Sequence, residues 1–139
     1  MTDSNLIDFA SRKAVEFATK LQSAMQSGNP QGALEAIAKD CVVTAPRILP
    51  WGGVTHGLDA FTKTLTVMGG FFSVTLQHFE VHPVGDQAMA IINATFTSRR
   101  SGRAVPVTII ELYRADQRGL IEITAFYQDP GPIAELARE

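Results

Sequence analysis

The spacing of apolar residues changes near Gly70, and this change constrains the fold more than any other feature of the chain. Before Gly70, apolar residues recur every three or four positions, which is typical of amphipathic helices. After it, they alternate with polar residues, which is typical of strands with one buried face. Helices followed by strands predict an α+β domain, with the helices packed on one side of a sheet.

The first half predicts three helices. The first has its apolar positions at helical spacing and ends at Gly28. Asn29 then caps a second helix with Pro30 at its first position, and a short strand follows at residues 42–45. A third helix begins near Gly57 and ends at Gly69-Gly70. The inner face of the second helix is predicted to be Ala33, Leu34 and Ile37. The apolar positions of the first are Phe9, Ala10, Ala14, Phe17, Ala18, Leu21 and Met25.

The second half predicts four strands, at about residues 72–82, 88–97, 105–113 and 120–128. Short turns join them, and short turns between strands mean antiparallel neighbours. Alternation along the second of these strands predicts one inward face. Its residues are Ala88, Ala90, Ile92, Ala94 and Phe96.

Composition narrows the class of protein. The 139 residues suit a single domain over residues 1–139, and the net charge of −2 gives no electrostatic footprint for nucleic acid. The one basic cluster, Arg99, Arg100 and Arg103, surrounds a Ser101-Gly102 hairpin turn and is interpreted as solvated. The N-terminus is polar and no segment approaches membrane-spanning length, so we expect a cytoplasmic protein that binds neither membrane nor nucleic acid.

Cysteine and histidine give no sign of a metal or cofactor. Cys41 is the only cysteine, which excludes an internal disulfide, and its apolar surroundings predict a buried, inert thiol. His56, His78 and His82 lack carboxylates or further histidines at ligand spacing, so no metal site is predicted. His78 and His82 share one strand face, which we interpret as solvated, whereas His56 lies at the start of the third helix and can reach a pocket.

Four segments together carry a resemblance to a known superfamily: residues 28–42, 55–57, 118–121 and 126–130. Their order and spacing resemble the nuclear transport factor 2-like superfamily, which includes SnoaL-like polyketide cyclases, ketosteroid isomerases and limonene epoxide hydrolases. The resemblance implies a cystatin-like cone, in which three N-terminal helices pack on a strongly curved antiparallel sheet around a pocket for a small apolar molecule. It also implies a homodimer formed by the outer faces of the sheets.

The catalytic residues of these enzymes are mostly missing. In the resemblance to ketosteroid isomerases, Ala45 takes the place of the catalytic Asp before Pro46. Leu21 takes the place of the Tyr donor, and Glu111 that of the second acid. The last-strand Asp of the epoxide hydrolases falls on Phe126. The isomerase constellation is therefore not expected to operate here.

Glu111 interrupts an apolar run over residues 105–112, where burial would raise the pKa of its carboxyl. Such a group can act as a general acid or donate a hydrogen bond to a ligand oxygen. Two interpretations remain open. Either Glu111 faces the pocket together with Ile109 and Tyr113, or it lies on the outer face and pairs with a cation such as Arg103 or with a residue of another subunit.

Trp51 and Asp129 each allow two interpretations. The sole tryptophan, Trp51, lies in a Pro/Gly loop, where it can close a pocket or pack on the domain's own core. Asp129 resembles an acid found near this point in SnoaL-like proteins, or it caps a helix over residues 131–138.

Three functional hypotheses follow. The first is a pocket protein that binds a small apolar ligand without the isomerase catalytic set. The second is an enzyme of the cyclase or isomerase type that uses Glu111 as its acid. The third is a structural or partner-binding homodimer, for which Asn93, Thr95 and Thr97 provide a polar sheet surface. The predicted pocket residues are Leu21, Ala45, Trp51, His56, Ile92, Ala94, Phe96, Ile109, Tyr113, Phe126 and Gln128.

Overall fold

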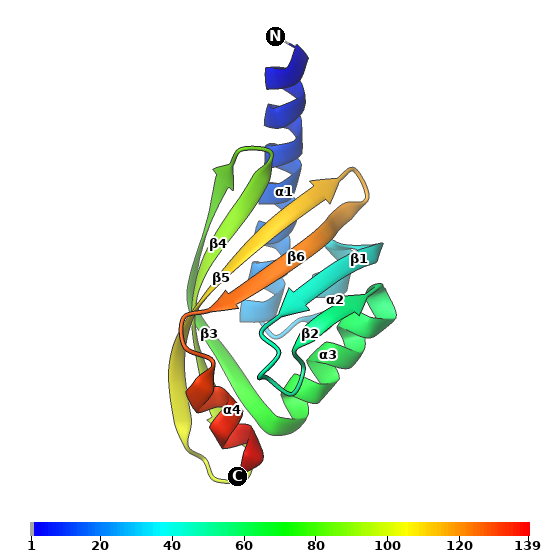
Figure 1. The fold of residues 1–139 in the computed structure, drawn as a ribbon. Coiled ribbons are helices and arrows are strands. Elements are labelled where there is room, and N and C mark those ends of the chain that lie inside the picture. Colours follow the sequence, from blue (N-terminus) through cyan, green and yellow to red (C-terminus); the bar gives the residue numbers. More distant parts are fainter. Residues whose placement is uncertain (1) are drawn as a thin grey trace.

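The computed structural model describes residues 2–139, with side chains from residue 5 onward. Figure 1 shows the helices and strands, coloured along the chain from blue at the N-terminus to red at the C-terminus. The elements are α1 (Thr2–Gln26), α2 (Pro30–Glu35), β1 (Ile37–Ala45), β2 (Gly53–His56), α3 (Leu58–Phe71), β3 (Phe72–Val84), β4 (Gln87–Ser98), β5 (Ala104–Asp116), β6 (Gly119–Tyr127) and α4 (Gly131–Arg138).

The strands form one six-stranded sheet in the order β2-β1-β6-β5-β4-β3. The predicted α+β class is confirmed, and β3 to β6 pair antiparallel through short turns as expected. The sheet as a whole is mixed, however, because β1 runs parallel to β6. Short turns determine only the pairing of strands that follow one another, so they could not predict this long-range pair.

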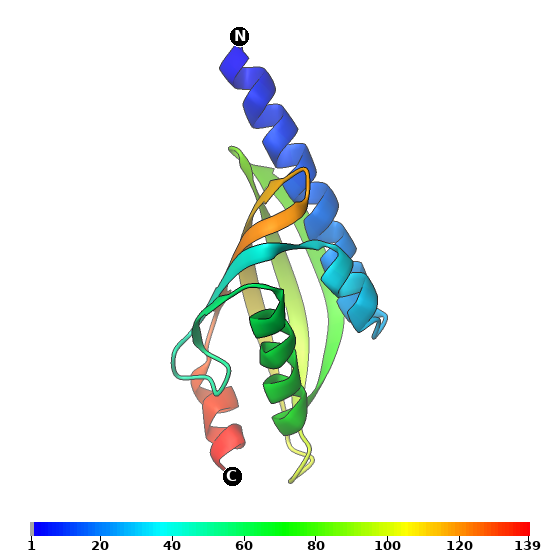
Figure 2. The same cartoon turned by 90° about the vertical axis from the view of Figure 1, so that its right-hand side faces the viewer.

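The sheet is strongly curved, and the helices lie on its concave side (Figures 1 and 2). The helix α1 runs along this side and its first turns project beyond the sheet, while α3 covers the other part. The C-terminal helix α4 lies beside the end of α3. None of the helices that the structure describes covers the convex face, so the two faces of the sheet have very different surroundings.

Two boundaries between helices and strands differ from the predicted ones. The Asn29 side chain accepts a hydrogen bond from the Gly32 N–H at 3.1 Å, as predicted for the cap of α2. However, α2 ends at Glu35 and Ile37 already belongs to β1, because the Ala36 carbonyl accepts the Leu120 N–H of β6 at 2.9 Å. At the other boundary, α3 continues through Gly69 and Gly70 to Phe71 before the chain enters β3.

Candidate ligand pocket

Side chains of β4 and β5 form the floor of the concave face. The buried residues of β4 alternate along the strand as predicted, and Ile92 pairs with Ile109 while Ala90 pairs with Glu111. Paired residues of neighbouring strands point to the same face. Ala94 has a short side chain and lines the space above the sheet.

A cavity of about 140 Å³ lies between this floor, α1, α3 and the loop before β2. An apolar cavity of about 150 Å³ is large enough to hold benzene, so the space suits a small ring compound. Its walls are mainly apolar. They comprise Leu21, Gln22, Met25, Val43, Ala45, Trp51, Phe61, Thr64, Leu65, Met68, Val74, Leu76, Ile92, Ala94, Phe96, Ile109, Glu111, Ile123, Ala125 and Tyr127.

Glu111 faces this cavity and is held by two neighbours. Its Oε1 accepts hydrogen bonds from the Tyr113 hydroxyl at 2.6 Å and from Gln22 Nε2 at 3.1 Å. Gln22 Nε2 also donates to the Tyr113 hydroxyl at 2.8 Å. Tyr113 is therefore fully buried beside the carboxyl and, contrary to the prediction, does not form part of the cavity wall. The alternative partner Arg103 instead pairs with Glu139 at 2.6 Å.

Burial is the main influence on the charge of Glu111 and raises the pKa of its carboxyl, while the hydrogen bonds from Tyr113 and Gln22 lower it. Burial also raises the pKa of Tyr113, and the adjacent Glu111 raises it further, so the Tyr113 hydroxyl keeps its proton and donates. Both donors use Oε1. Within the described residues no protein group bonds to Oε2, which can give a proton to a ligand or accept one from it.

Aromatic rings form the end of the pocket around Trp51. The indole stacks on Phe96 at 5.9 Å between ring centroids with 5° between the planes, and it meets the edge of Phe72 at 5.9 Å. The Tyr127 ring lies 6.1 Å from that of Phe96. Trp51 thus both packs on the core and lines the cavity, so the two predicted roles coincide in one position.

Besides Tyr113, three predicted pocket residues lie outside the cavity wall. Phe126 and Gln128 are exposed, because Ala125 and Tyr127 are the residues of the last strand that face the cavity. The reason is a bulge: Arg114 pairs with Glu122 but Ala115 pairs with Leu120, which leaves Ile121 as an extra residue. An extra residue reverses the alternation beyond it. The third, His56, pairs with Val42 and is exposed rather than directed into the pocket.

Sequence reasoning missed three polar residues of the cavity wall, Gln22, Thr64 and Tyr127. Gln22 follows Ala18 by four residues, so helical spacing alone placed it on the inner face of α1, where it is only 4% exposed. Tyr127 gave no such signal, because only the bulge in β6 turns it inward.

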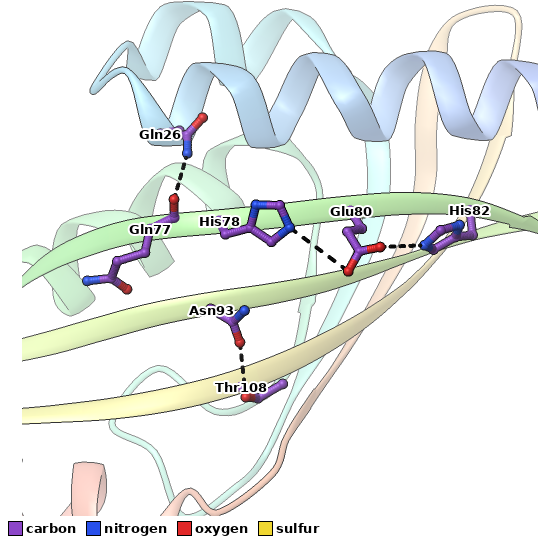
Figure 3. Close-up of polar contacts among 7 residues, drawn as sticks. All are labelled: Gln26, Gln77, His78, Glu80, His82, Asn93 and Thr108. Carbon is purple, nitrogen blue, oxygen red and sulfur yellow. Dashed lines mark hydrogen bonds and ion pairs between the residues drawn. The ribbon is translucent and has the colours of Figure 1, made fainter.

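The other histidines lie on the convex face (Figure 3). His78 and His82 are exposed on one side of β3, as predicted, and flank Glu80 at 3.9 and 3.3 Å. In the next two strands, the Thr108 hydroxyl donates to Asn93 Oδ1 at 3.2 Å. These polar contacts belong to the outer surface and have no connection to the cavity.

Asp129 and Cys41 do not contribute to the pocket. The exposed Asp129 accepts the N–H of Gly131 at 3.3 Å, at the start of α4. Cys41 is fully buried, and burial, with smaller contributions from Asp40 and Glu122, raises the pKa of its thiol to about 12. The thiol is therefore protonated and unreactive near neutral pH.

Among the described residues, no group of three or more histidine, cysteine, aspartate or glutamate side chains is arranged to hold a metal ion. Within the same part of the chain, no helix is long and apolar enough to cross a membrane.

Comparison with known proteins identifies the family. The model of the SnoaL-like domain matches residues 18–123, and the chain therefore belongs to the SnoaL-like domain family. No curated protein matches the chain.

Solved structures share the fold at low sequence identity. A nuclear transport factor 2-like protein of unknown function from Burkholderia pseudomallei has 17% identity and a TM-score of 0.81, with 91% of this chain and 98% of that chain covered. TerC, co-crystallised with polyporic acid, has 15% identity and a TM-score of 0.79, with 91% and 99% covered. A Xanthomonas campestris protein titled "putative polyketide cyclase" has 15% identity and a TM-score of 0.71, with 90% and 97% covered. At these identities the likeness shows the fold alone.

Proposed function

We propose that this protein binds a small, largely apolar molecule in the cavity on the concave face of its sheet. The observation that carries the proposal is the cavity of about 140 Å³, whose apolar walls enclose a single carboxyl group. Pockets of this kind, apolar with a few placed polar groups, are the usual form of small-molecule sites. The lack of an acid at Ala45 favours binding over isomerase chemistry.

The proposal can be tested by filling the cavity. Ala94→Leu places a larger side chain inside it, whereas Thr95→Leu makes the same side chain on the opposite face of the same strand. We expect the wild type and Thr95→Leu to bind indane, a bicyclic hydrocarbon, in calorimetric titration, and Ala94→Leu to bind at least about tenfold more weakly because ligand and side chain compete for one space. Equal binding by both variants would contradict the proposal, and so would the absence of saturable binding to the wild type. Near-ultraviolet circular dichroism checks that both variants fold.

A second candidate function is proton transfer with Glu111 as the acid. It is favoured by the free Oε2 atom and by burial, which raises the pKa of the carboxyl. Among the described residues Glu111 is the only carboxylate on the cavity wall, so no second acid is present to act as base.

A small β,γ-unsaturated cyclic ketone, of a size that the cavity can hold, tests this second candidate. Loss of a general base typically costs about a hundred- to ten-thousand-fold in rate, so we expect turnover far below that of an ordinary isomerase. Any residual rate that depends on the proton of Glu111 should fall in Glu111→Gln, while indane binding is retained. Efficient turnover would show that another residue acts as base.

We also propose that two copies pair through the convex faces of their sheets. Ile110 and Phe126 are neighbours on this face and are 37% and 52% exposed. Polar groups lie on the same face toward one edge of the sheet, namely Asn93 on β4 and the row His78, Glu80 and His82 on β3 (Figure 3), and an apolar centre beside polar residues is typical of an interface. Light scattering at micromolar concentration should give twice the chain mass, and Ile110→Glu should give the monomer mass. A monomeric wild type would exclude the dimer under these conditions.

A further inference from the structure

The cavity holds one acidic side chain and no opposite charge. Glu111 provides the only carboxyl group of the wall, and none of the described wall residues is a lysine, an arginine or a histidine. The titratable neighbours of this carboxyl, Tyr113 and Tyr127, stay neutral because burial raises the pKa of both hydroxyls. A carboxylate withdrawn from water without a cation is costly, so a positive charge on a ligand would be stabilised here.

One oxygen of the Glu111 carboxyl is free to meet a ligand. Both protein donors, the Tyr113 hydroxyl and Gln22 Nε2, bond to Oε1. Across residues 5–139, no group donates to Oε2, and this atom is not sealed off, since Glu111 is half-buried and lies on the cavity wall. Oε2 is therefore an acceptor that a ligand in the cavity can reach.

Gln22 provides a second free acceptor beside Glu111. Its Nε2 donates to Glu111 Oε1 and to the Tyr113 hydroxyl. Because that hydroxyl gives its own proton to Glu111, both neighbours accept from the amide, and this fixes which end of the amide faces them. The amide oxygen, Oε1 of Gln22, is directed away from these two groups, and no donor among the described residues bonds to it.

The wall of α3 adds a third polar group that can accept a hydrogen bond. The Thr64 hydroxyl donates its proton to the Ala60 carbonyl at 3.0 Å, so its oxygen is left to accept. Free acceptors and a negative charge together favour a ligand that donates hydrogen bonds and carries a positive charge. A primary ammonium group does both, because it has three N–H donors and no acceptor.

We propose that Glu111 Oε2 and Gln22 Oε1 together bind the ammonium group of a small ring amine, so that the pocket selects this cation over a hydrocarbon of the same shape. This inference rests on the proposed binding function and names the class of ligand. The apolar walls hold the ring, and the two acceptors fix its orientation. A neighbouring ammonium lowers the pKa of a carboxyl, so the bound amine offsets the effect of burial on Glu111.

Three ligands that share one ring skeleton and differ in charge test the inference: 1-aminoindane, indane and indane-1-carboxylate. Near neutral pH the amine is a cation, as the lysine side chain is, and the carboxylate is an anion. In calorimetric titration we expect 1-aminoindane to bind about ten- to a hundredfold more tightly than indane, the range for a hydrogen bond to a charged group. Indane-1-carboxylate should bind more weakly than indane, because Glu111 repels it.

Three variants locate the preference. Glu111→Gln removes the charge and keeps the size of the side chain, so it should weaken the binding of 1-aminoindane by about tenfold or more and strengthen that of indane-1-carboxylate. A variant that merely folded badly would weaken both. Gln22→Met removes the second acceptor and should lower the ratio of the amine and indane affinities. Glu80→Gln removes the same charge from the exposed convex face and should leave all three affinities unchanged.

The outcomes separate this inference from the proposed function. If indane binds to the wild type and 1-aminoindane binds no more tightly, the amine site is refuted while the pocket remains a binding site. If none of the three ligands binds to the wild type, the binding function and the amine site fail together. If the preference for the amine persists in Glu111→Gln, the cation is bound elsewhere and the assignment to Glu111 is wrong.

Discussion

Phe96 and Phe126 show how differently the two faces of one sheet are built. Phe96 lies on the concave face and is 1% exposed, packed between Trp51, Phe72 and Tyr127. Phe126 lies on the convex face and is 52% exposed. The same residue type thus forms a wall of the pocket on one side and part of an open surface on the other.

The polar groups of the two faces differ in the same way. On the concave face Gln22, Glu111 and Tyr113 form a buried cluster whose members satisfy one another. On the convex face, Asn93 and Thr108 form an exposed pair beside solvent (Figure 3). Because hydrogen bonds are stronger, and unpaired groups more costly, away from water, we expect changes on the concave face to have larger effects.

The largest difference is expected between Phe96→Ala and Phe126→Ala. Removal of the buried ring should lower the free energy of unfolding by about 3–5 kcal/mol, because it removes apolar burial and leaves a cavity. Removal of the exposed ring should change it by less than about 1 kcal/mol. Urea denaturation measures both. The two variants are compared at a protein concentration low enough to keep the chain monomeric, because a loss at Phe126 that grows with protein concentration would be the contribution of the proposed dimer interface.

A smaller difference is expected between Tyr113→Phe and Thr108→Val. The first variant removes the hydroxyl that donates to Glu111 and accepts from Gln22, so we expect a loss of about 1–3 kcal/mol in the free energy of unfolding. The second removes an exposed hydrogen bond and should cost about 0.5 kcal/mol or less. Equal losses in the two variants, measured by thermal or urea unfolding, would show that the buried cluster adds no extra stability.

The smallest effect concerns pH. Because burial raises the pKa of Glu111 in the folded chain, its contribution to stability is fully present below the unfolded pKa of about 4.3 and is lost as the pH rises through the folded pKa. A tenfold change in the proton affinity of the carboxyl on folding corresponds to about 1.4 kcal/mol. Glu111→Gln keeps an acceptor for Tyr113 and Gln22 but cannot lose a proton, so the decrease in stability above about pH 4.3 should be smaller than in the wild type.

Glu80→Gln is the control for this experiment, because it removes one exposed carboxylate from the convex face. Urea midpoints measured between pH 4 and pH 8 give a profile of stability against pH for the wild type and for each variant. The pH values lie on either side of the reference pKa of glutamate, which is about 4.3. If Glu111→Gln and the wild type gave parallel profiles, Glu111 would not be the group that titrates in the folded state.

Strand β4 and strand β6 show how far the site could be predicted. Alternation along β4 correctly placed Ile92, Ala94 and Phe96 on the concave face, and an unbroken register with β5 placed Ile109 and Glu111 with them. In β6 the bulge at Ile121 reverses the alternation, so the prediction chose Phe126 where Ala125 and Tyr127 face the cavity. A bulge depends on pairing with the next strand, and local alternation does not reveal it.

The sequence by itself determined the features that depend on neighbouring residues: the change from helices to strands near Gly70, the cap at Asn29 and the inward face of β4. Only the tertiary structure decided which distant segments meet. The parallel pairing of β1 with β6, and the meeting of Trp51, Glu111 and Tyr127 at one cavity, join residues far apart in the chain. Such contacts depend on register, curvature and helix packing across the whole domain, which local spacing does not encode.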